Sequence, residues 1–228
     1  MAAIVGLSMA GTLAPLTARQ VVEKSLAARG GAAEFAAVHS LSFRGHLDLG
    51  AQGSAPLAVW MTVQPPRIRV ELTLPQGKMV QGYDGRTAWM QPPGQTTAQV
   101  LTGAMAKSLQ DQATGGVDLM AVADTHPQLV GTGRLEGHDY YEIRFTLPSG
   151  DSFAQYVDAH TWLAFHEEYP GGVEAISDYQ RTGKLLLPMR YVSGPAGQPG
   201  TPLVREQITL NPAIADSMFR NPATGGRQ

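Results

Sequence analysis

The residues that come closest to a chemically useful cluster in this 228-residue chain stand in one short segment: His160, His166, Glu167 and Glu168. Two imidazoles and one carboxylate are a donor set that binds divalent metals such as iron. The six histidines of the chain, however, are not spaced as two ligands on one helix face or one strand face. The simpler interpretation is a pair of strands whose polar side chains face solvent, and the sequence predicts no metal site.

The motifs of the common enzyme classes are missing from the sequence. It contains no Gly-x-Ser-x-Gly elbow, no P-loop, no Gly-x-Gly-x-x-Gly and no His-Glu-x-x-His. Asp84 and Asp158 stand in predicted turns, where an aspartate accepts hydrogen bonds from nearby backbone amides. That structural role accounts for both residues. The sequence therefore predicts no catalytic residue, no cofactor and no enzyme activity.

Composition narrows the class of protein further. Hydrophobic residues make up 43% of the chain and charged residues only 16%, which is low beside the about 25% of an average domain. The net charge of −2 offers no basic stripe for a nucleic acid. The absence of cysteine excludes disulfides, thiolate catalysis, cysteine-ligated zinc and a lipid-modified N-terminal cysteine in the chain as given.

The elements that must position any site are mostly strands. Apolar and polar residues alternate strictly in three segments, 41–49, 67–74 and 140–147, as they do in antiparallel strands with one wet and one dry face. Further strands are expected at 55–64, 79–83, 87–91, 151–158, 162–169, 173–181, 186–193 and 202–210. A sheet of about eleven strands must curl or close, so the sequence predicts a mainly β fold.

Two helical regions interrupt the strands. A capping box formed by Thr17 and Gln20 predicts a helix over 17–29, which Gly30 and Gly31 end, and a short continuation follows in "GAAEFAAV". Residues 97–113 return to helical periodicity, with a stripe of Leu101, Met105 and Leu109, and 117–124 is expected to form a second short helix.

No linker divides the chain. Residues 1–18 are apolar and small, like a secretory signal, although no basic residue precedes them; a loosely docked arm is the alternative. Residues 19–222 are expected to form a single domain, and 223–228 a loose tail.

The dry face of the sheet is the expected functional surface. The predicted helices are too few to cover so wide a face, so a cavity for an apolar guest is expected between sheet and helices. The residues expected to contact such a ligand are Ile68, Val70, Leu72, Trp89, Leu101, Met105, Leu109, Tyr141, Ile143 and Phe145.

Four segments carry a resemblance to a known family: "GYDGRTAW" (82–89), "GRLEGHDYYEIRFTLPSGDSFAQYVDAHTWL" (133–163), "SDYQRTGKLLLP" (177–188) and "ITLNPAIADSMFRNP" (208–222). In this order they resemble the LolA-type outer-membrane lipoprotein-sorting proteins, over roughly residues 17–222. The resemblance implies a half-open antiparallel β-barrel of about eleven strands, covered by an N-terminal helix and by an inserted helical lid at 98–113.

The resemblance also implies a function. It implies a periplasmic, monomeric carrier that holds lipoprotein acyl chains or another lipid and meets inner- and outer-membrane protein partners transiently. Because the chain has no cysteine, the soluble carrier branch fits better than the lipid-modified receptor branch. The family's Arg-Pro pair, whose arginine helps to latch the lid, is replaced by Pro65-Pro66, while Arg67 and Arg69 should face water. A lipid sensor or structural envelope protein on the same fold is the second hypothesis, and an unrecognised hydrolase the third.

Overall fold

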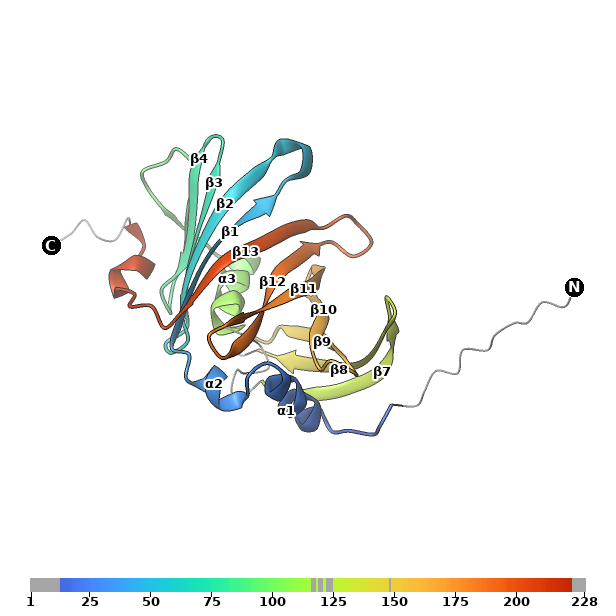
Figure 1. The fold of residues 1–228 in the computed structure, drawn as a ribbon. Helices are drawn as coiled ribbons and strands as arrows, with labels where there is room; N and C mark the ends of the chain where they lie inside the picture. Colours follow the sequence, from blue (N-terminus) through green and yellow to red (C-terminus); the bar gives the residue numbers. More distant parts are fainter. Residues whose placement is uncertain (1–12, 116–117, 119–120, 122–124, 148, 223–228) are drawn as a thin grey trace, which may run out of the picture.

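Residues 13–115, 118, 121, 125–147 and 149–222 are described by a computed structural model of the chain. Thirteen strands in this part of the chain form one antiparallel sheet in the order β6-β5-β4-β3-β2-β1-β13-β12-β11-β10-β9-β8-β7 (Figure 1). The strands are β1 (Ser40–Asp48), β2 (Ser54–Thr62), β3 (Arg67–Leu74), β4 (Gly77–Tyr83), β5 (Ala88–Gln91), β6 (Gln99–Val100), β7 (Gln128–Leu135), β8 (His138–Thr146), β9 (Ser152–Asp158), β10 (Ala164–Tyr169), β11 (Gly172–Thr182), β12 (Leu185–Gly194) and β13 (Thr201–Leu210). Strands β6 and β7 are the two open edges, so the sheet curls without closing.

The mainly β, half-open architecture is confirmed, with two strands more than the alternation pattern predicted. Strand β7 was missed because Gly131 and Gly133 interrupt its apolar side chains, and glycine weakens the strand pattern. Strand β6 has only two residues and pairs with β5, where the sequence indicated the start of a helix. The inner face of the curve holds the core, and Tyr141, Ile143 and Phe145 on β8 are 0–2% exposed.

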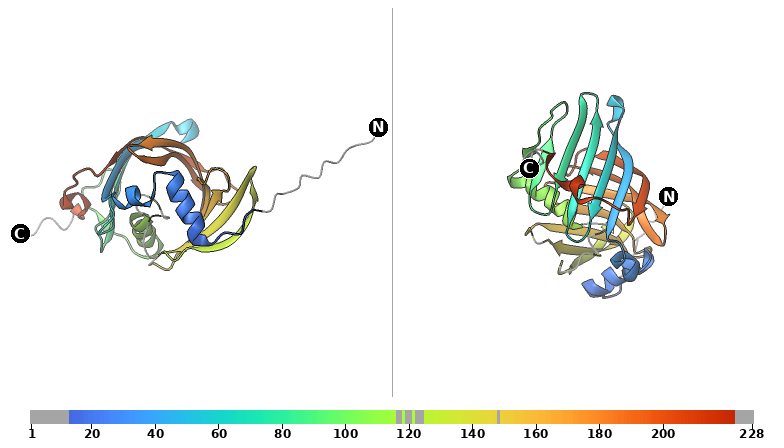
Figure 2. Two further views of the ribbon diagram at one scale, coloured as in Figure 1. Left: turned by 60° about the horizontal axis from the view of Figure 1, so that its bottom comes forward. Right: turned by 90° about the vertical axis from the view of Figure 1, so that its left-hand side faces the viewer.

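Helix α1 (Ala18–Ala28) closes one end of the curve together with α2 (Ala32–Ala36), as the left view of Figure 2 shows. The predicted capping box is present, because the Thr17 side chain accepts from the Gln20 amide and the Gln20 side chain accepts from the Thr17 amide. The predicted stop is present as well. Gly30 and Gly31 have φ values of 122° and 98°, which side chains with a Cβ rarely adopt.

The described part of the N-terminal arm, from residue 13 onward, contacts the sheet. Leu13 and Leu16 pack against the core, and the Tyr141 hydroxyl donates to the Ala14 carbonyl at 3.0 Å. Residues 1–12 of the expected signal-like arm and 223–228 of the expected tail lie outside the described residues. Among the described helices, none combines the length and the apolar character needed to cross a bilayer.

Helix α3 (Gly103–Gly115) lies inside the curve of the sheet in both Figure 1 and Figure 2. It contacts β3, β4 and β5. The helix begins at Gly103 rather than near residue 97, since Gln99 and Val100 are taken up by β6. The second helix expected over 117–124 falls almost wholly outside the described residues.

The C-terminal segment covers part of the outer face. A short 3-10 helix, η3 (Asp216–Phe219), contacts β3. Phe219 is fully buried there, and the Trp89 indole donates to its carbonyl at 3.0 Å. Trp89 stands opposite Gly82, which stands opposite Arg69, so these three residues share the face away from the core. Arg69 lies over the Trp89 ring, 5.6 Å from its centre.

Asp158 organises the turn between β9 and β10, as its turn position predicted. Its carboxylate accepts from the amides of His160 and Thr161 at 3.0 and 2.7 Å, and His138 Nδ1 lies 2.7 Å from the other oxygen. Burial opposes its charge, but these hydrogen bonds outweigh burial and lower its pKa to about 2.

This aspartate should contribute acid-sensitive stability. Because its folded pKa of about 2 lies below the ordinary aspartate pKa of 3.8, the contribution is complete above pH 3.8 and is lost as the pH falls through about 2. We expect Asp158→Asn to lower the free energy of unfolding at neutral pH by about 2 kcal/mol and to flatten the decline between those pH values. Urea unfolding at several pH values measures both effects. The exposed Asp48→Asn serves as the control, and an equally acid-sensitive Asp158→Asn protein would contradict the assignment.

Candidate functional site: the inner face of the curved sheet

Most of the residues predicted to contact a ligand lie on the inner face. Five are buried there, in strands β3 and β8: Ile68, Leu72, Tyr141, Ile143 and Phe145. Leu109 on α3 is 2% exposed and packs into the same cluster, and Val70 and Leu101 are partly buried against it. Met105 is 54% exposed, and Trp89 lies on the outer face. The structure thus brings eight of the ten residues together.

A partly exposed apolar strip borders this buried cluster. Residues that pack on the cluster and keep some exposure include Leu47, Val70, Leu74, Met79 and Leu203. Leu47 and Leu203 stand opposite each other on β1 and β13, so the strip continues across the middle of the sheet. This surface can exchange water for an apolar guest without the unfolding of a strand.

Helix α3 is held on two sides. Leu109 and Ala113, four residues apart, are buried on the side of the cluster. From the helix, Lys107 Nζ donates to Asp151 Oδ1 at 2.5 Å in the loop between β8 and β9. Lys107 thus links α3 to the loop between β8 and β9.

A second carboxylate belongs to the same contact. Asp111 is 5% exposed, and burial together with neighbouring Asp151 raises its pKa, although Ser149 and Lys107 act in the opposite direction. The Lys107–Asp151 pair and Asp111 therefore form a polar latch on the helix, which we call the α3 latch.

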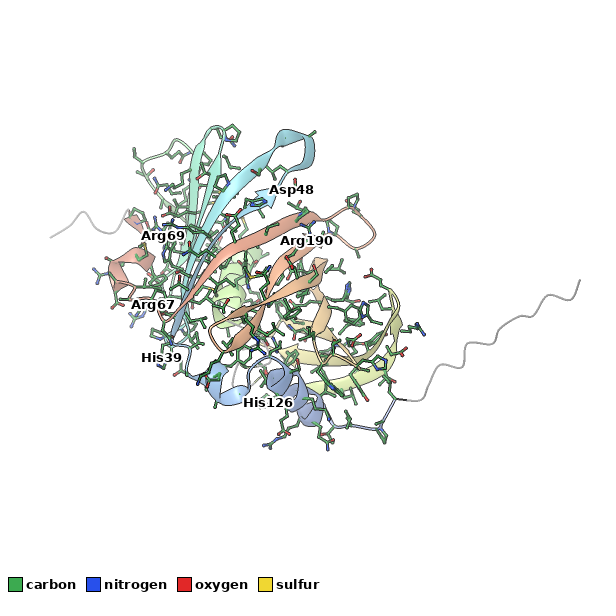
Figure 3. The ribbon with its side chains drawn as sticks, in the orientation of Figure 1. His39, Asp48, Arg67, Arg69, His126 and Arg190 are labelled. Atoms are coloured by element: carbon green, nitrogen blue, oxygen red, sulfur yellow. The ribbon has the colours of Figure 1, made fainter. Side chains whose placement is uncertain are left out.

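Arg67 and Arg69, the arginines near the family's latch position, make their contacts on the outer face of the sheet. Arg67 Nη1 lies 2.6 Å from Asp216 Oδ1, and Arg69 pairs with Glu71 at 2.8 Å while donating to the Met218 carbonyl. Figure 3 shows both arginines beside the C-terminal segment, on the side of β3 away from α3. They point away from the core as the alternation predicted, but the C-terminal segment partly covers them.

A polar row crosses the inner face, which sequence reasoning missed. Ile143, Gln155, Glu167, Glu174 and Ser193 stand opposite one another on five successive strands, β8 to β12. Side chains that are directly opposite in antiparallel strands point to the same face. Because Ile143 is fully buried in the core, the whole row faces inward.

The interpretation of Glu167 as a solvent-facing residue is therefore wrong. A register shift between Ala164 and His166 places Glu167 on the inner face, and no feature of "AFHEEY" in isolation indicates it. Burial raises the pKa of Glu167 to about 8, against the hydrogen bond from Gln155, and burial also raises the pKa of Glu174. The two histidines of this segment have different carboxylate partners. His160 lies 3.5 Å from Asp139, and His166 lies 3.9 Å from Glu168.

One arginine acts on this row, because the charge of Arg205 lowers the pKa of Glu174 against the effect of burial. Arg205 stands between the rings of Phe43 and Tyr191, 4.6 and 4.5 Å from their centres. Arg29, at the end of α1, forms a two-pronged ion pair with Asp118 and is 1% exposed. Within the described residues, no group of three or more histidine, aspartate or glutamate side chains is placed to hold a metal ion.

Two hollows of the surface lie elsewhere. One of about 240 Å³ is bordered mainly by outward residues of β1, β2 and β13, among them Ser42, Trp60 and Thr209. The other, of about 450 Å³, lies at the loops that follow β1 and precede β13. The inner face under α3 is filled by Leu109 and Ala113, so a guest there must displace the helix or use the partly exposed strip.

The described residues thus form an open half-barrel with a largely apolar inner face and a helix packed inside the curve. No family model matches the chain, and no curated protein matches it. Solved structures do. A LolA superfamily protein from Nitrosomonas europaea is 17% identical, with a TM-score of 0.61 over 91% of this chain and 99% of that one.

A second solved structure supports the same architecture. A DUF1329 family protein from Desulfovibrio piger is 10% identical, with a TM-score of 0.60 over 89% of this chain and 97% of that one. At these identities the likeness concerns the fold. The chain has a LolA-like fold, and the resemblance carried by its four sequence segments is confirmed at that level.

Proposed function

We propose that this protein is a periplasmic carrier that binds the acyl chains of a lipoprotein or of another lipid on the inner face of its sheet. The observation that carries the proposal is the large apolar cluster of the inner face, bordered by partly exposed apolar side chains, with helix α3 packed inside the curve. The likeness to a LolA superfamily protein supports the same class of function. The proposal includes two further points. The carrier is monomeric, and it meets protein partners in the inner and outer membranes transiently.

The geometry explains how such a carrier binds and releases its load. Each methylene that leaves water for the inner face contributes about 0.8 kcal/mol. Release requires that the enclosure be incomplete, and the open edges β6 and β7 leave it so. The α3 latch and the Leu109 contact hold the helix when no ligand is present, and an acyl chain replaces the Leu109 contact when α3 moves.

Two alternatives make different predictions. A lipid sensor on the same fold binds lipid without passing it to an acceptor membrane, and a hydrolase returns its ligand chemically changed. The experiment is a titration of the purified protein with an apolar fluorescent dye, with decanol and with a phospholipid, whose ester bonds a hydrolase would cleave, followed by mass spectrometry of the recovered ligand. Transfer to acceptor vesicles then separates a carrier from a sensor.

A matched pair of variants on β3 tests where the ligand binds. Val70→Asp places a charge on the partly exposed strip, whereas Thr73→Asp places the same charge on the exposed outer side of the same strand. We expect Val70→Asp to weaken dye and decanol binding about tenfold or more, and Thr73→Asp to leave both unchanged. Equal effects of the two variants would place the ligand somewhere other than the inner face.

A further inference from the structure

We propose that Gln155, Glu167 and Glu174 form a binding site for the primary ammonium head group of an amphiphile. The inference rests on the proposed function, because the apolar chain of that amphiphile would lie along the inner face. It adds the chemistry of the head group, which neither the fold nor the apolar surface specifies.

The three residues are neighbours on the inner face. Glu167 stands directly opposite Gln155 on one side and Glu174 on the other, so the two carboxyl groups lie side by side in one row. Gln155 Nε2 donates to Glu167 Oε2 at 2.7 Å, and the Ser193 hydroxyl donates to Glu174. Both glutamates keep partial exposure, so a molecule on the inner face can reach them.

An acceptor at this site lacks a partner. Gln155 is 5% exposed, and its Oε1 is buried without a hydrogen bond. A buried acceptor left unpaired costs about 1–3 kcal/mol. Its neighbours in the row are two more oxygen acceptors, the carboxyl groups. A primary ammonium group carries three N–H donors and no acceptor of its own, so it can supply the donors that Gln155 Oε1 and the two carboxyl groups accept.

The surroundings favour a cation over an anion or a sugar. The ring of Tyr169 stacks on Phe153 with centres 6.5 Å apart, and burial, together with the charges of Glu174 and Glu167, raises the pKa of that tyrosine. Aromatic faces attract cations. An anionic head group would meet two carboxyl groups here, and a hydroxyl group could not satisfy three acceptors.

The neighbouring charges decide how binding depends on pH. Besides burial, the charge of Asp118 raises the pKa of Glu167. Arg205 lies between two aromatic rings and donates to the Pro188 carbonyl, and its charge lowers the pKa of Glu174 against the effect of burial. With a pKa of about 8, Glu167 is mostly neutral at pH 7 and ionises as the pH rises. An alkylammonium group stays charged there, since amines of this kind titrate near pH 10.4. Binding is therefore expected to strengthen as the pH rises through about 8.

The test compares four ten-carbon probes below their micelle concentrations: decylamine, decyltrimethylammonium, decanol and decanoate. We expect decylamine to bind most tightly, with an affinity that rises about tenfold between pH 6 and pH 9, and decanol to show no such rise. Decyltrimethylammonium carries the same charge but donates no hydrogen bond, so it should bind less tightly than decylamine. Isothermal titration calorimetry at each pH measures these differences.

Two isosteric variants and one matched control locate the effect. At pH 9, where Glu167 is ionised, Glu167→Gln and Glu174→Gln should each weaken decylamine binding about tenfold and leave decanol binding unchanged. Glu168→Gln removes a charge from the adjacent position, whose side chain bonds to Tyr156 instead, and should change neither. Circular dichroism confirms that each variant is folded.

The outcomes separate the two proposals. If no probe binds, both the carrier and the ammonium site are wrong. If decanol and decanoate bind as well as decylamine, or if Glu168→Gln weakens decylamine binding as much as Glu167→Gln does, the carrier stands and the ammonium site is overturned.

Discussion

Replacing Ile143 with glutamate is expected to unfold the protein, whereas Leu109→Glu is expected to detach α3 and leave the sheet folded. Ile143 is fully buried in the middle of β8, so its replacement places a carboxylate where no strand can yield without breaking the sheet. The expected loss is about 5 kcal/mol or more, at the upper end of the effects of single substitutions.

Leu109 is buried almost as deeply, at 2% exposure, but it belongs to a helix that is held only by one apolar side and by the α3 latch. Once the charge drives α3 off the sheet, the loss is limited to the free energy of docking the helix. We expect a loss about half as large as that for Ile143→Glu, with fast amide exchange confined to α3.

Met105→Glu is the matched control for this helix, because Met105 is 54% exposed. It should change the free energy of unfolding by less than about 0.5 kcal/mol. Urea unfolding and hydrogen exchange of the three variants provide the measurements. If Leu109→Glu unfolds the sheet as completely as Ile143→Glu, α3 is fixed core and not a removable helix.

Arg29→Met is expected to produce the second largest effect. The guanidinium of Arg29 holds Asp118 with two nitrogens, donates through Nε to the Ser25 carbonyl at 3.2 Å and lies over the Phe35 ring. Burial opposes its charge, but Asp118 outweighs burial and raises its pKa, so it remains a cation. Removal of this charge leaves a largely buried carboxylate behind and should cost about 3–5 kcal/mol.

The double variant separates the charge from the packing. Arg29→Met with Asp118→Asn removes both charges, and we expect it to recover part of the stability lost in Arg29→Met alone. Arg19→Met is the control, since Arg19 forms an exposed pair with Glu23 on the same helix and should contribute less than about 1 kcal/mol. Thermal unfolding of all four proteins decides the question. A double variant less stable than Arg29→Met would show that the pair does not act as a unit.

The sequence alone determined the strands and their faces wherever alternation was strict. Ile68 and Leu72 on β3, and Ile143 and Phe145 on β8, point inward because a strand sends alternate side chains to opposite faces. The capping box at Thr17 and the turn at Asp158 were equally local, since their hydrogen bonds join residues a few positions apart. The curl of the sheet followed from the number of strands, because a large twisted sheet cannot remain flat.

Only the tertiary structure decided which groups meet across the molecule. Trp89 stands opposite Gly82 on the outer face, and there the C-terminal segment, 130 residues further on, supplies a carbonyl for its indole. Lys107 pairs with Asp151 across the curve, and Arg29 pairs with Asp118. The partners of each pair lie too far apart in the sequence for a local pattern to predict the contact. Glu167 faces inward because of one register shift in β10, and a shift of that kind reverses every later side chain. The apolar face could therefore be predicted from the sequence, whereas the inward direction of the polar row could be known only from the pairing of the strands.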